Sequence, residues 1–444
     1  MKKILIRDIV KAVNGKFYGD EKFLHKYVAN VNTDSRKKVS ETLFIPLIGE
    51  KFDAHEFIDQ AILNGAVCVL SENILSDDKI FIKVESTNKA LLDLAEYYRT
   101  LFDIKVVAIT GSCGKTTTKD MIANVLSQSY NVLKTKGNFN NQVGLPLTIF
   151  ELEDDVQIAV LEMGTNHFGE IETLSKVAKP DVCVITNIGV SHIENFKDQL
   201  GILKAKSEIF SYAQDNFVAV LNGDDEYLRK LDLENVIYYG FDVTNNIFAY
   251  DVHGNSFSAN DFSQQINLNY AGQYMIKNAL AAIAVGHYFN VPDEKIKAGL
   301  ENFQMSAMRM EVLHSDNNFT IINDVYNASP DSMRAAIDVL AENNQCKRKI
   351  CILGDMFELG EQSEKFHFEL GKYLSGKKIN LAICIGRSAK NIFDGINSGT
   401  EKKYYPAKEN FFADMKNIFW KDSIVLVKAS RAMHFEDIVQ KLMR

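Results

Sequence analysis

The sequence predicts an α/β protein of three domains, at residues 1–83, 84–311 and 312–444. A chain of 444 residues exceeds what one hydrophobic core organises, and roughly 150 residues per domain gives about three domains. Short β-rich runs alternate with amphipathic helical segments along almost the whole chain, as in α/β folds. Near residue 112, a glycine turn joins a buried strand directly to a helix, which is typical of a doubly wound parallel sheet.

The first domain is predicted to be a small α/β unit. Strand-like runs occupy residues 42–46 and 66–70, with a helix at 54–64 between them. Residues 88–101 carry apolar side chains at helical spacing and predict a helix that connects to the next domain.

The central and third domains each show strands separated by helical segments. We therefore expect a parallel sheet in the central domain and a smaller Rossmann-like sheet in the third. The predicted central strands lie at residues 106–110, 158–163, 181–189 and 217–224, with helices at 115–130 and 274–289. The predicted strands of the third domain lie at residues 320–324, 349–355, 381–386 and 424–430.

Composition excludes several classes of protein. The formal net charge of −8 argues against nucleic acid as a partner. Six cysteines without a CxxC pair indicate free thiols in a reducing compartment. The N-terminal MKKILIRDIVKAV is interrupted by charges and predicts a folded helix, not a signal peptide, and no run of about 18 apolar residues predicts membrane insertion. We expect a cytoplasmic monomer.

The strongest motif runs from Ile109 to Thr118, ITGSCGKTTT. Ile109 stands where the usual GxxxxGK[ST] pattern has its first glycine, so the shorter GxxGK[ST] remains. Backbone N–H groups at such a turn, and the dipole of the helix that follows, favour phosphate, while Lys115 reaches the β and γ phosphates and Thr116 offers a hydroxyl to Mg²⁺. This indicates a P-loop-type, mononucleotide-binding sheet. The candidate nucleotide-binding residues are Gly111, Ser112, Cys113, Gly114, Lys115, Thr116 and Thr117.

The segment KGNFNNQVG, residues 136–144, places three side-chain amides within four residues. Asn138 and Asn141 are candidates for binding substrate and nucleotide, respectively. An Asn-rich turn without a ligand explains the same segment equally well.

Polar side chains also follow two strands of the central sheet. Glu162 ends one strand and His192 follows another. Because ligand groups gather at the carboxyl ends of parallel strands, a carboxylate and an imidazole there can hold a metal ion.

Two lysines lie on different faces of the helix predicted near residues 200–212. Lys204 shares its face with Glu208, as in a solvated ion pair. Lys206 lies among Ile202, Leu203, Ile209 and Phe210, so it must reach water with its end, lose its proton, or be chemically modified. A neutral Lys206 amine can take up CO₂ and become a carbamate.

The third domain has polar clusters at three strand ends: Asp324, Gly354–Met356 and Lys428–Ala432. Turn chemistry accounts for any one of them. Three at one edge of a sheet are better explained by a ligand.

Taken together, several segments resemble the Mur ligase family in order along all three predicted domains. They are TGSCGKTTTK, KGNFNNQVGLP, LEMGTNHFGEI, TNIGVSHIENF, KAKSEIF, LNGDD, YMIKNALAA, NDVYNASPDSM and GDMFELG. The resemblance implies an ATP-dependent ligase with two Mg²⁺ ions. It would phosphorylate the terminal carboxylate of a UDP-muramoyl tripeptide and join the acyl phosphate to the amine of D-alanyl-D-alanine, a step of peptidoglycan precursor synthesis.

The resemblance also assigns roles to individual residues. Thr116 and Glu162 would contact the metal ions, His192 would bind the second ion, and Lys206 would be carbamylated. The expected catalytic residues are Lys115, His192 and Lys206. Asn278 and Asp324 resemble residues that hold adenine and ribose, and Arg309 one that reaches ATP phosphate. Expected substrate-binding residues are Ser35, Arg36, Asp53 and His55 for the UDP-sugar, together with Asn138, Lys428, Ser430 and Arg431.

Two positions depart from the expected pattern. Ala429 replaces a glycine that the family usually carries, so the backbone there must avoid positive φ. Cys113 lies at a helix N-terminus, where a lowered thiol pKa would expose it to oxidation.

Two alternatives stay open at the level of sequence. One is the sister Mur ligase that adds the third amino acid, although no DNPR-like segment is found. The other is a P-loop nucleotide-binding switch, which would share only the phosphate loop.

Overall fold

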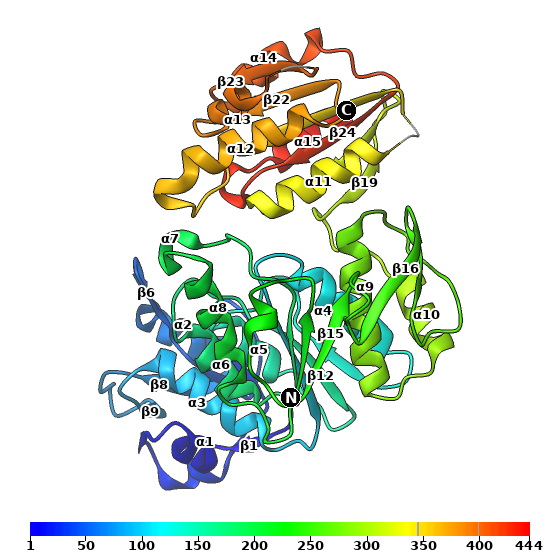
Figure 1. Ribbon diagram of the computed structural model, residues 1–444. Coiled ribbons are helices and arrows are strands. Elements are labelled where there is room, and N and C mark those ends of the chain that lie inside the picture. The colour runs from blue at the N-terminus through cyan, green and yellow to red at the C-terminus, as the bar shows by residue number, and fades with distance from the viewer. Residues whose placement is uncertain (344–345, 398) are drawn as a thin grey trace. The chain divides into compact units, whose positions relative to one another are not determined.

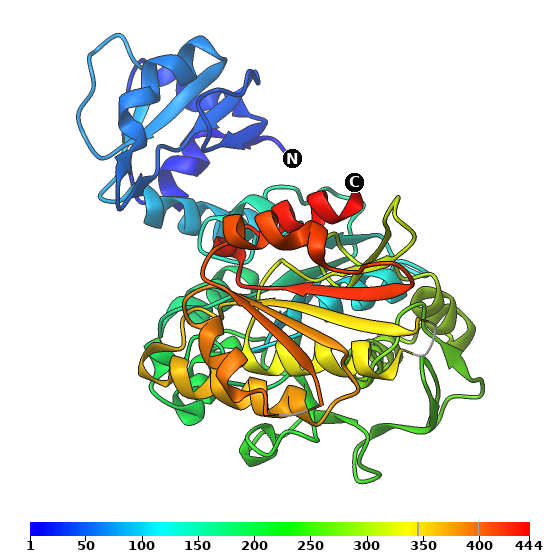
Figure 2. The same ribbon diagram turned by 90° about the horizontal axis from the view of Figure 1, so that it is seen from above.

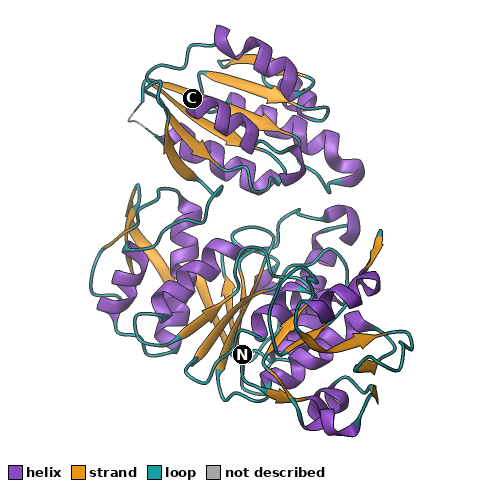
Figure 3. Ribbon diagram, turned by 180° about the vertical axis from the view of Figure 1, so that it is seen from behind, coloured by secondary structure: helices purple, strands orange, loops and turns teal. Residues whose placement is uncertain are grey.

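The computed structural model describes residues 1–343, 346–397 and 399–444, which form two compact units. Unit 1 comprises Met1–Thr110, Ser129–Val184 and Ser207–Ala219, and unit 2 comprises Gly111–Gln128, Ile185–Lys206 and Val220–Arg444. Both units combine helices with sheets that contain parallel strands, which confirms the predicted α/β class (Figures 1 and 3). The predicted domain boundaries stay predictions.

The first part of unit 1 is a five-stranded sheet in the order β2-β9-β8-β5-β4. Adjacent strands of this sheet are parallel, except that β2 pairs antiparallel with β9. Phe44, Val69 and Phe81 form its core with Ile58 and Ala61. The elements are β1 (Ile4–Leu5), α1 (Ile6–Ala12), β2 (Lys16–Tyr18), β3 (Tyr27–Val28), β4 (Asn30–Asn32), β5 (Thr42–Phe44), β6 (Ile48–Gly49), β7 (Phe52–Asp53), α2 (Ile58–Leu63), β8 (Ala66–Ser71) and β9 (Phe81–Lys83).

The second part of unit 1 carries strands in the order β11-β12-β10-β13, and β12 pairs parallel with both β11 and β10. The connecting helix α3 begins after Ser86, whose hydroxyl accepts a hydrogen bond from the Lys89 N–H, and it buries its predicted apolar face. The elements are α3 (Thr87–Arg99), β10 (Lys105–Thr110), β11 (Val132–Lys134), α5 (Gly144–Ile149), β12 (Ile158–Glu162), α6 (Glu170–Ala178) and β13 (Val182–Ile185).

Unit 2 begins with the helix that follows the glycine turn and continues with strands in the order β14-β15-β16-β17-β18. The pairs β16–β17 and β17–β18 are antiparallel, an extension that the sequence did not predict. The elements are α4 (Lys115–Leu126), α7 (Ile193–Phe196), α8 (Gln199–Ser207), β14 (Val218–Asn222), β15 (Val236–Gly240), β16 (Ile247–His253), β17 (Ser256–Ala259), β18 (Ile266–Asn267), α9 (Gln273–Tyr288) and α10 (Asp293–Glu301).

The last part of unit 2 is the predicted Rossmann-like sheet, in the order β19-β20-β24-β21-β22-β23. All pairs are parallel except the edge strand β19. Helices cover both faces, with α15 on one and α11 and α12 on the other (Figure 2). The elements are β19 (Glu311–His314), β20 (Thr320–Asn323), α11 (Pro330–Glu342), β21 (Arg348–Gly354), α12 (Ser363–Ser375), β22 (Leu381–Ile385), α13 (Ala389–Gly395), β23 (Glu401–Tyr405), α14 (Lys408–Asp414), β24 (Ser423–Lys428) and α15 (Glu436–Met443).

Within the part of the chain that the structure describes, no helix is both long and apolar enough to span a membrane.

Candidate active site

The glycine turn before α4 has the tight backbone that a phosphate loop requires. Gly111 and Gly114 have φ values of 149° and 83°. A Cβ added to Gly111 would lie 1.8 Å from the Thr186 hydroxyl, and one on Gly114 would lie 3.0 Å from Asn278 Oδ1. Both positions therefore need glycine, for conformation and for space. The Lys115 ammonium donates to the Gly111 carbonyl at 2.8 Å.

The sequence suggested that the N–H groups of this turn face a phosphate. In the structure, two of them instead donate to a side chain. Asn187 Oδ1 accepts hydrogen bonds from the N–H groups of Ser112, at 3.1 Å, and Cys113, at 2.9 Å. The first turn of α4 instead presents N–H groups that have no intrahelical acceptor, including those of Thr116 and Thr117. These groups are the better phosphate donors.

Arg309 lies beside the start of α4, in agreement with its predicted role. Its Nη2 donates to the Thr116 hydroxyl at 3.0 Å, and its guanidinium lies 4.0 Å from the ring centre of Tyr326. The contact brings a cation next to the hydroxyl that is expected to bind Mg²⁺.

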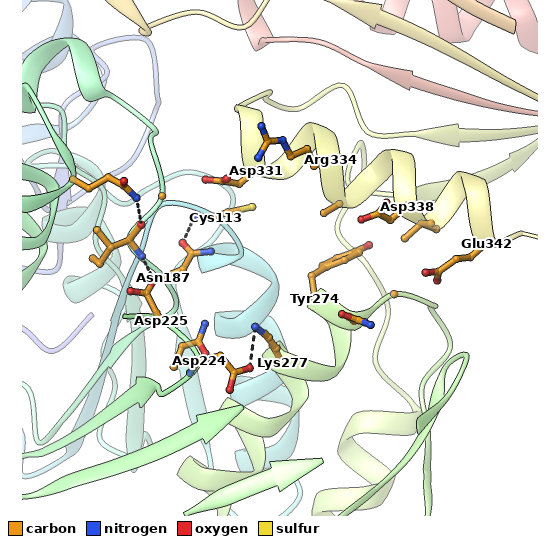
Figure 4. A pocket seen from close by; sticks show the side chains of 18 of the residues that line it. Cys113, Asn187, Asp224, Asp225, Tyr274, Lys277, Asp331, Arg334, Asp338 and Glu342 are labelled. Atoms are coloured by element: carbon orange, nitrogen blue, oxygen red, sulfur yellow. Dashed lines mark hydrogen bonds and ion pairs between the residues drawn. The ribbon is translucent and has the colours of Figure 1, made fainter. Parts of the chain in front are cut away.

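A pocket of 660 Å³ opens beside Cys113 of the turn (Figure 4). Tyr274 and Lys277 of α9 line it on one side, and Asp331 and Arg334 of α11 line it on another. Its volume lies within the range of small-molecule sites.

Two polar atoms of α9 near this pocket are buried without a hydrogen-bond partner among the described residues. They are the Tyr274 hydroxyl and Asn278 Nδ2. Asn278 Oδ1 does have a partner, because it accepts from the Thr118 hydroxyl at 3.1 Å. Unpaired buried donors are uncommon and indicate a missing ligand or water.

Asp324 and Lys428, predicted separately at two strand ends, form one ion pair. Lys428 also donates to the Asn327 carbonyl at 2.8 Å, and Asp324 Oδ1 accepts from the Met310 N–H at 3.2 Å. Ser430 lies two residues after Lys428, and its hydroxyl accepts a hydrogen bond from the Phe357 N–H at 2.9 Å. Arg431 pairs with Glu436 at 3.2 Å and is half-exposed.

Ala429 is fully buried and is not among the residues with positive φ, as expected. The expectation for Cys113 was wrong. Burial raises the pKa of its thiol, and this outweighs the nearby Lys428 and Lys115, which lower it. The helix end alone therefore does not make this cysteine reactive.

Lys206 lies buried in α8 with 2% of its surface exposed, whereas Lys204 is exposed. Burial, together with the positive charge of Lys115, lowers the pKa of Lys206 well below the usual lysine value. A neutral amine is the form that reacts with CO₂. The structure therefore supports the prediction that Lys206, on the apolar face of this helix, can lose its proton.

Glu162, at the end of β12 in unit 1, is prepared to bind a cation. It is 2% exposed, and its Oε1 accepts from Asn140 Nδ2 at 2.7 Å. Its Oε2 is buried with no partner among the described residues. A buried carboxylate oxygen without a donor fits a divalent ion such as Mg²⁺.

Asn140 is the residue of segment 136–144 whose side-chain amide contacts Glu162. The sequence did not single it out. Asn141 Oδ1 accepts from the N–H groups of Val143 and Gly144 at the start of α5, which matches the turn alternative. Asn138 is exposed. Identical amides in one run cannot be told apart without the turn geometry.

His192 contacts a residue that the sequence did not single out. Its Nδ1 lies 2.6 Å from Glu358 Oε2, in the loop after β21. The contact falls outside hydrogen-bond geometry, and it becomes an ion pair when the imidazole is protonated. The pair lowers the pKa of Glu358. The GDMFELG segment was the only available signal for this residue.

The candidate UDP-sugar residues lie around α2 of unit 1. The Ser35 hydroxyl donates to Gln60 Oε1 at 2.9 Å, and Asp53 caps the turn that leads into α2. His55 uses both ring nitrogens inside the domain: Nδ1 lies 2.6 Å from Asp53, and Nε2 accepts from the Glu72 N–H. Arg36 forms an exposed pair with Asp34.

Comparison with known proteins places these features in a family. The Mur ligase middle domain matches residues 109–286, and the Mur ligase glutamate ligase domain matches residues 308–431. The chain is 37% identical to the UDP-N-acetylmuramoyl-tripeptide–D-alanyl-D-alanine ligase of Bacillus subtilis, over 100% of this chain and 99% of that protein.

Solved structures agree with this. A crystal structure of MurF from Acinetobacter baumannii is similar with a TM-score of 0.92 and 31% identity, over 100% of this chain and 99% of that one. MurF from Thermotoga maritima in complex with ADP is similar with a TM-score of 0.83 and 30% identity, over 93% of this chain and 97% of that one. The chain therefore belongs to the Mur ligase family, and it has the three-domain fold of that family.

Proposed function

We propose that this chain is the ATP-dependent ligase that joins D-alanyl-D-alanine to the free carboxylate of UDP-N-acetylmuramoyl tripeptide in the cytoplasm. The proposal is carried by a phosphate loop of the required geometry. This loop lies in a chain that matches a UDP-N-acetylmuramoyl-tripeptide–D-alanyl-D-alanine ligase over 100% of its residues. The product is a peptidoglycan precursor.

The chemistry needs an activated acyl group, because a carboxylate repels nucleophiles. A carboxylate oxygen of the tripeptide attacks the γ-phosphorus of ATP and ADP leaves. The dipeptide amine then attacks the acyl carbon, the C–O bond to phosphate breaks, and phosphate and a proton are released. Lys115 and the first turn of α4 would stabilise the negative charge that develops on the transferred phosphoryl group.

The nucleotide would extend from the phosphate loop toward the α9 side of the pocket. The unpaired Tyr274 hydroxyl and Asn278 Nδ2 support a polar ligand there. Asp324 is proposed to hold the ribose, and Arg309 to exchange its Thr116 contact for a phosphate oxygen. The complex of a MurF relative with ADP supports nucleotide binding.

Divalent cations would lower the barrier by neutralising phosphate charge. Thr116, Glu162, His192 and Lys206 are the proposed ligands for two Mg²⁺ ions. Glu162 offers an unpaired oxygen, and Lys206 offers a buried amine that can add to CO₂ with loss of one proton. The carbamate so formed would supply a second carboxylate.

Neither alternative is favoured. A relative that is 37% identical over the whole chain is a D-alanyl-D-alanine ligase, so the sister ligase is not supported. A nucleotide switch would not require the rest of the chain.

A test of the ligase assignment is the dependence of ATP turnover on the two other substrates. We expect continued ADP release over many turnovers only when the UDP-muramoyl tripeptide and D-alanyl-D-alanine are both present. Rapid turnover with ATP and Mg²⁺ alone would contradict the assignment.

A further inference from the structure

The loop between β21 and α12 carries Glu358 onto His192, and no role described so far uses this contact. We propose that Glu358 is a positioning residue that orients His192 toward its divalent cation and so completes the cation site only when this loop is docked. The inference rests on the proposed function, in which His192 is a metal ligand.

The geometry leaves one ring nitrogen for a metal. Nδ1 of His192 lies 2.6 Å from Glu358 Oε2. No hydrogen bond to Nε2 occurs among the described residues. Metal-bound histidines usually present one ring nitrogen to the ion and the other to a carboxylate, which fixes the ring orientation. The Glu358 carboxylate already lies at Nδ1, which leaves Nε2 for the ion.

The backbone on both sides of the contact is unusual. His192 has φ of 60° and Glu358 has φ of 63°. Residues other than glycine seldom adopt this left-handed conformation, which is found in turns and is enriched at functional sites. Two such residues facing each other indicate that the loop and the turn before α7 are shaped for this contact.

The loop is held in place from its own domain. Met356 donates its N–H to His367 Nε2 at 2.9 Å, and Phe357 donates its N–H to the Ser430 hydroxyl at 2.9 Å. The Ser430 N–H donates to the Asp355 carbonyl at 3.1 Å. The backbone that precedes Glu358 is therefore fixed by buried partners, while the Glu358 side chain itself is half-exposed.

The loop also lies close to the α7 segment. Gly360 has φ of 54°, and a Cβ at that position would lie 3.2 Å from the Glu194 side chain. The fit leaves little room, so Glu358 reaches His192 only when the loop lies against α7. A surface ion pair would not require this fit.

The test measures binding of Mn²⁺ to the full-length protein in the presence of ADP, from the electron paramagnetic resonance signal of free Mn²⁺. We expect Glu358→Ala to weaken Mn²⁺ binding by about 10–100-fold, the usual effect of losing such a partner, and Glu358→Gln to weaken it less. The matched controls Glu361→Ala and Glu361→Gln, at an exposed position of the same loop, should bind as wild type.

A double-mutant cycle with His192→Ala separates orientation from an independent effect. If Glu358 acts through His192, the double mutant binds Mn²⁺ no more weakly than His192→Ala alone. In turnover, Glu358→Ala should raise the metal concentration needed for half the maximal rate, and excess metal should restore most of kcat. A variant that does not fold is recognised by thermal unfolding, and Glu358→Gln then carries the test.

Wild-type Mn²⁺ affinity in both Glu358 variants, with weakened binding in His192→Ala, would overturn this inference and leave the proposed function intact. Wild-type affinity in His192→Ala as well would overturn the metal assignment of the proposed function itself.

Discussion

Arg309 donates a hydrogen bond of 3.0 Å to the hydroxyl of Thr116 at the start of α4. The hydroxyl proposed to bind Mg²⁺ is thus held by the same arginine that is proposed to reach ATP phosphate. If both proposed roles hold, nucleotide binding exchanges this contact for two others, one from Thr116 to the ion and one from Arg309 to phosphate.

Removing the arginine should therefore weaken catalysis with ATP. We expect Arg309→Ala to lower kcat/KM for ATP by about 10–100-fold, the scale of one lost hydrogen bond to a charged group. Arg309→Lys should recover only part of this, because lysine lacks the planar fork. Tyr326→Phe keeps the stacked ring and serves as the control. Steady-state kinetics decide, and an unchanged kcat/KM in Arg309→Ala would count against the assignment.

Lys115 lies at the phosphate loop, where phosphoryl transfer is expected. Lys115→Ala should reduce kcat by about two orders of magnitude or more, the scale of one lost charge-stabilising donor. Single-turnover measurement of acyl phosphate formation would place the loss in the first step. Near-normal turnover would exclude the phosphate loop as the site of transfer.

Lys206 and Lys204 form a matched pair on one helix. Lys206→Ala should be nearly inactive, since it removes the buried amine, whereas Lys204→Ala removes an exposed one and should cost little. A small carboxylic acid added to Lys206→Ala should restore part of the rate by replacing the carbamate. Equal losses in the two variants would exclude the carbamate.

His367 should make stability depend on pH. Burial lowers its pKa below the usual 6.5, and its Nε2 accepts a hydrogen bond from the Met356 N–H. Because the unfolded chain binds the proton more readily, stability is complete above pH 6.5 and falls as the pH drops below it toward the lowered pKa. Denaturant unfolding between pH 5 and 8 measures this, and His367→Gln should flatten the dependence. An equal slope in the variant would show that other groups cause it.

Local features were the most predictable from sequence. The phosphate loop was identified because the buried strand, the two glycines and the helix are adjacent in the chain. The distant Thr186 and Asn278, which limit the space at Gly111 and Gly114, were found only in the structure. The apolar neighbours of Lys206 followed from helical spacing, but whether its end reaches water or is buried stayed open until the structure showed it buried.

Features that depend on distant contacts were not predictable. Glu358 meets His192 from another part of the chain, and no periodicity marks it. The pKa of Cys113 was misjudged because the helix end is visible in sequence and the burial of the thiol is not. The antiparallel strands β17 and β18 have only four and two residues, so they were also missed.

The central claim concerns which amine is joined, and a product assay by mass tests it most directly. Purified protein with ATP, Mg²⁺ and the UDP-muramoyl tripeptide is offered D-alanyl-D-alanine, in parallel with the UDP-muramoyl dipeptide offered a free diamino acid. The account predicts one product, the tripeptide plus D-alanyl-D-alanine less one water, formed with one ADP per amide. Preferential addition of the free diamino acid to the dipeptide would contradict it and identify the sister ligase.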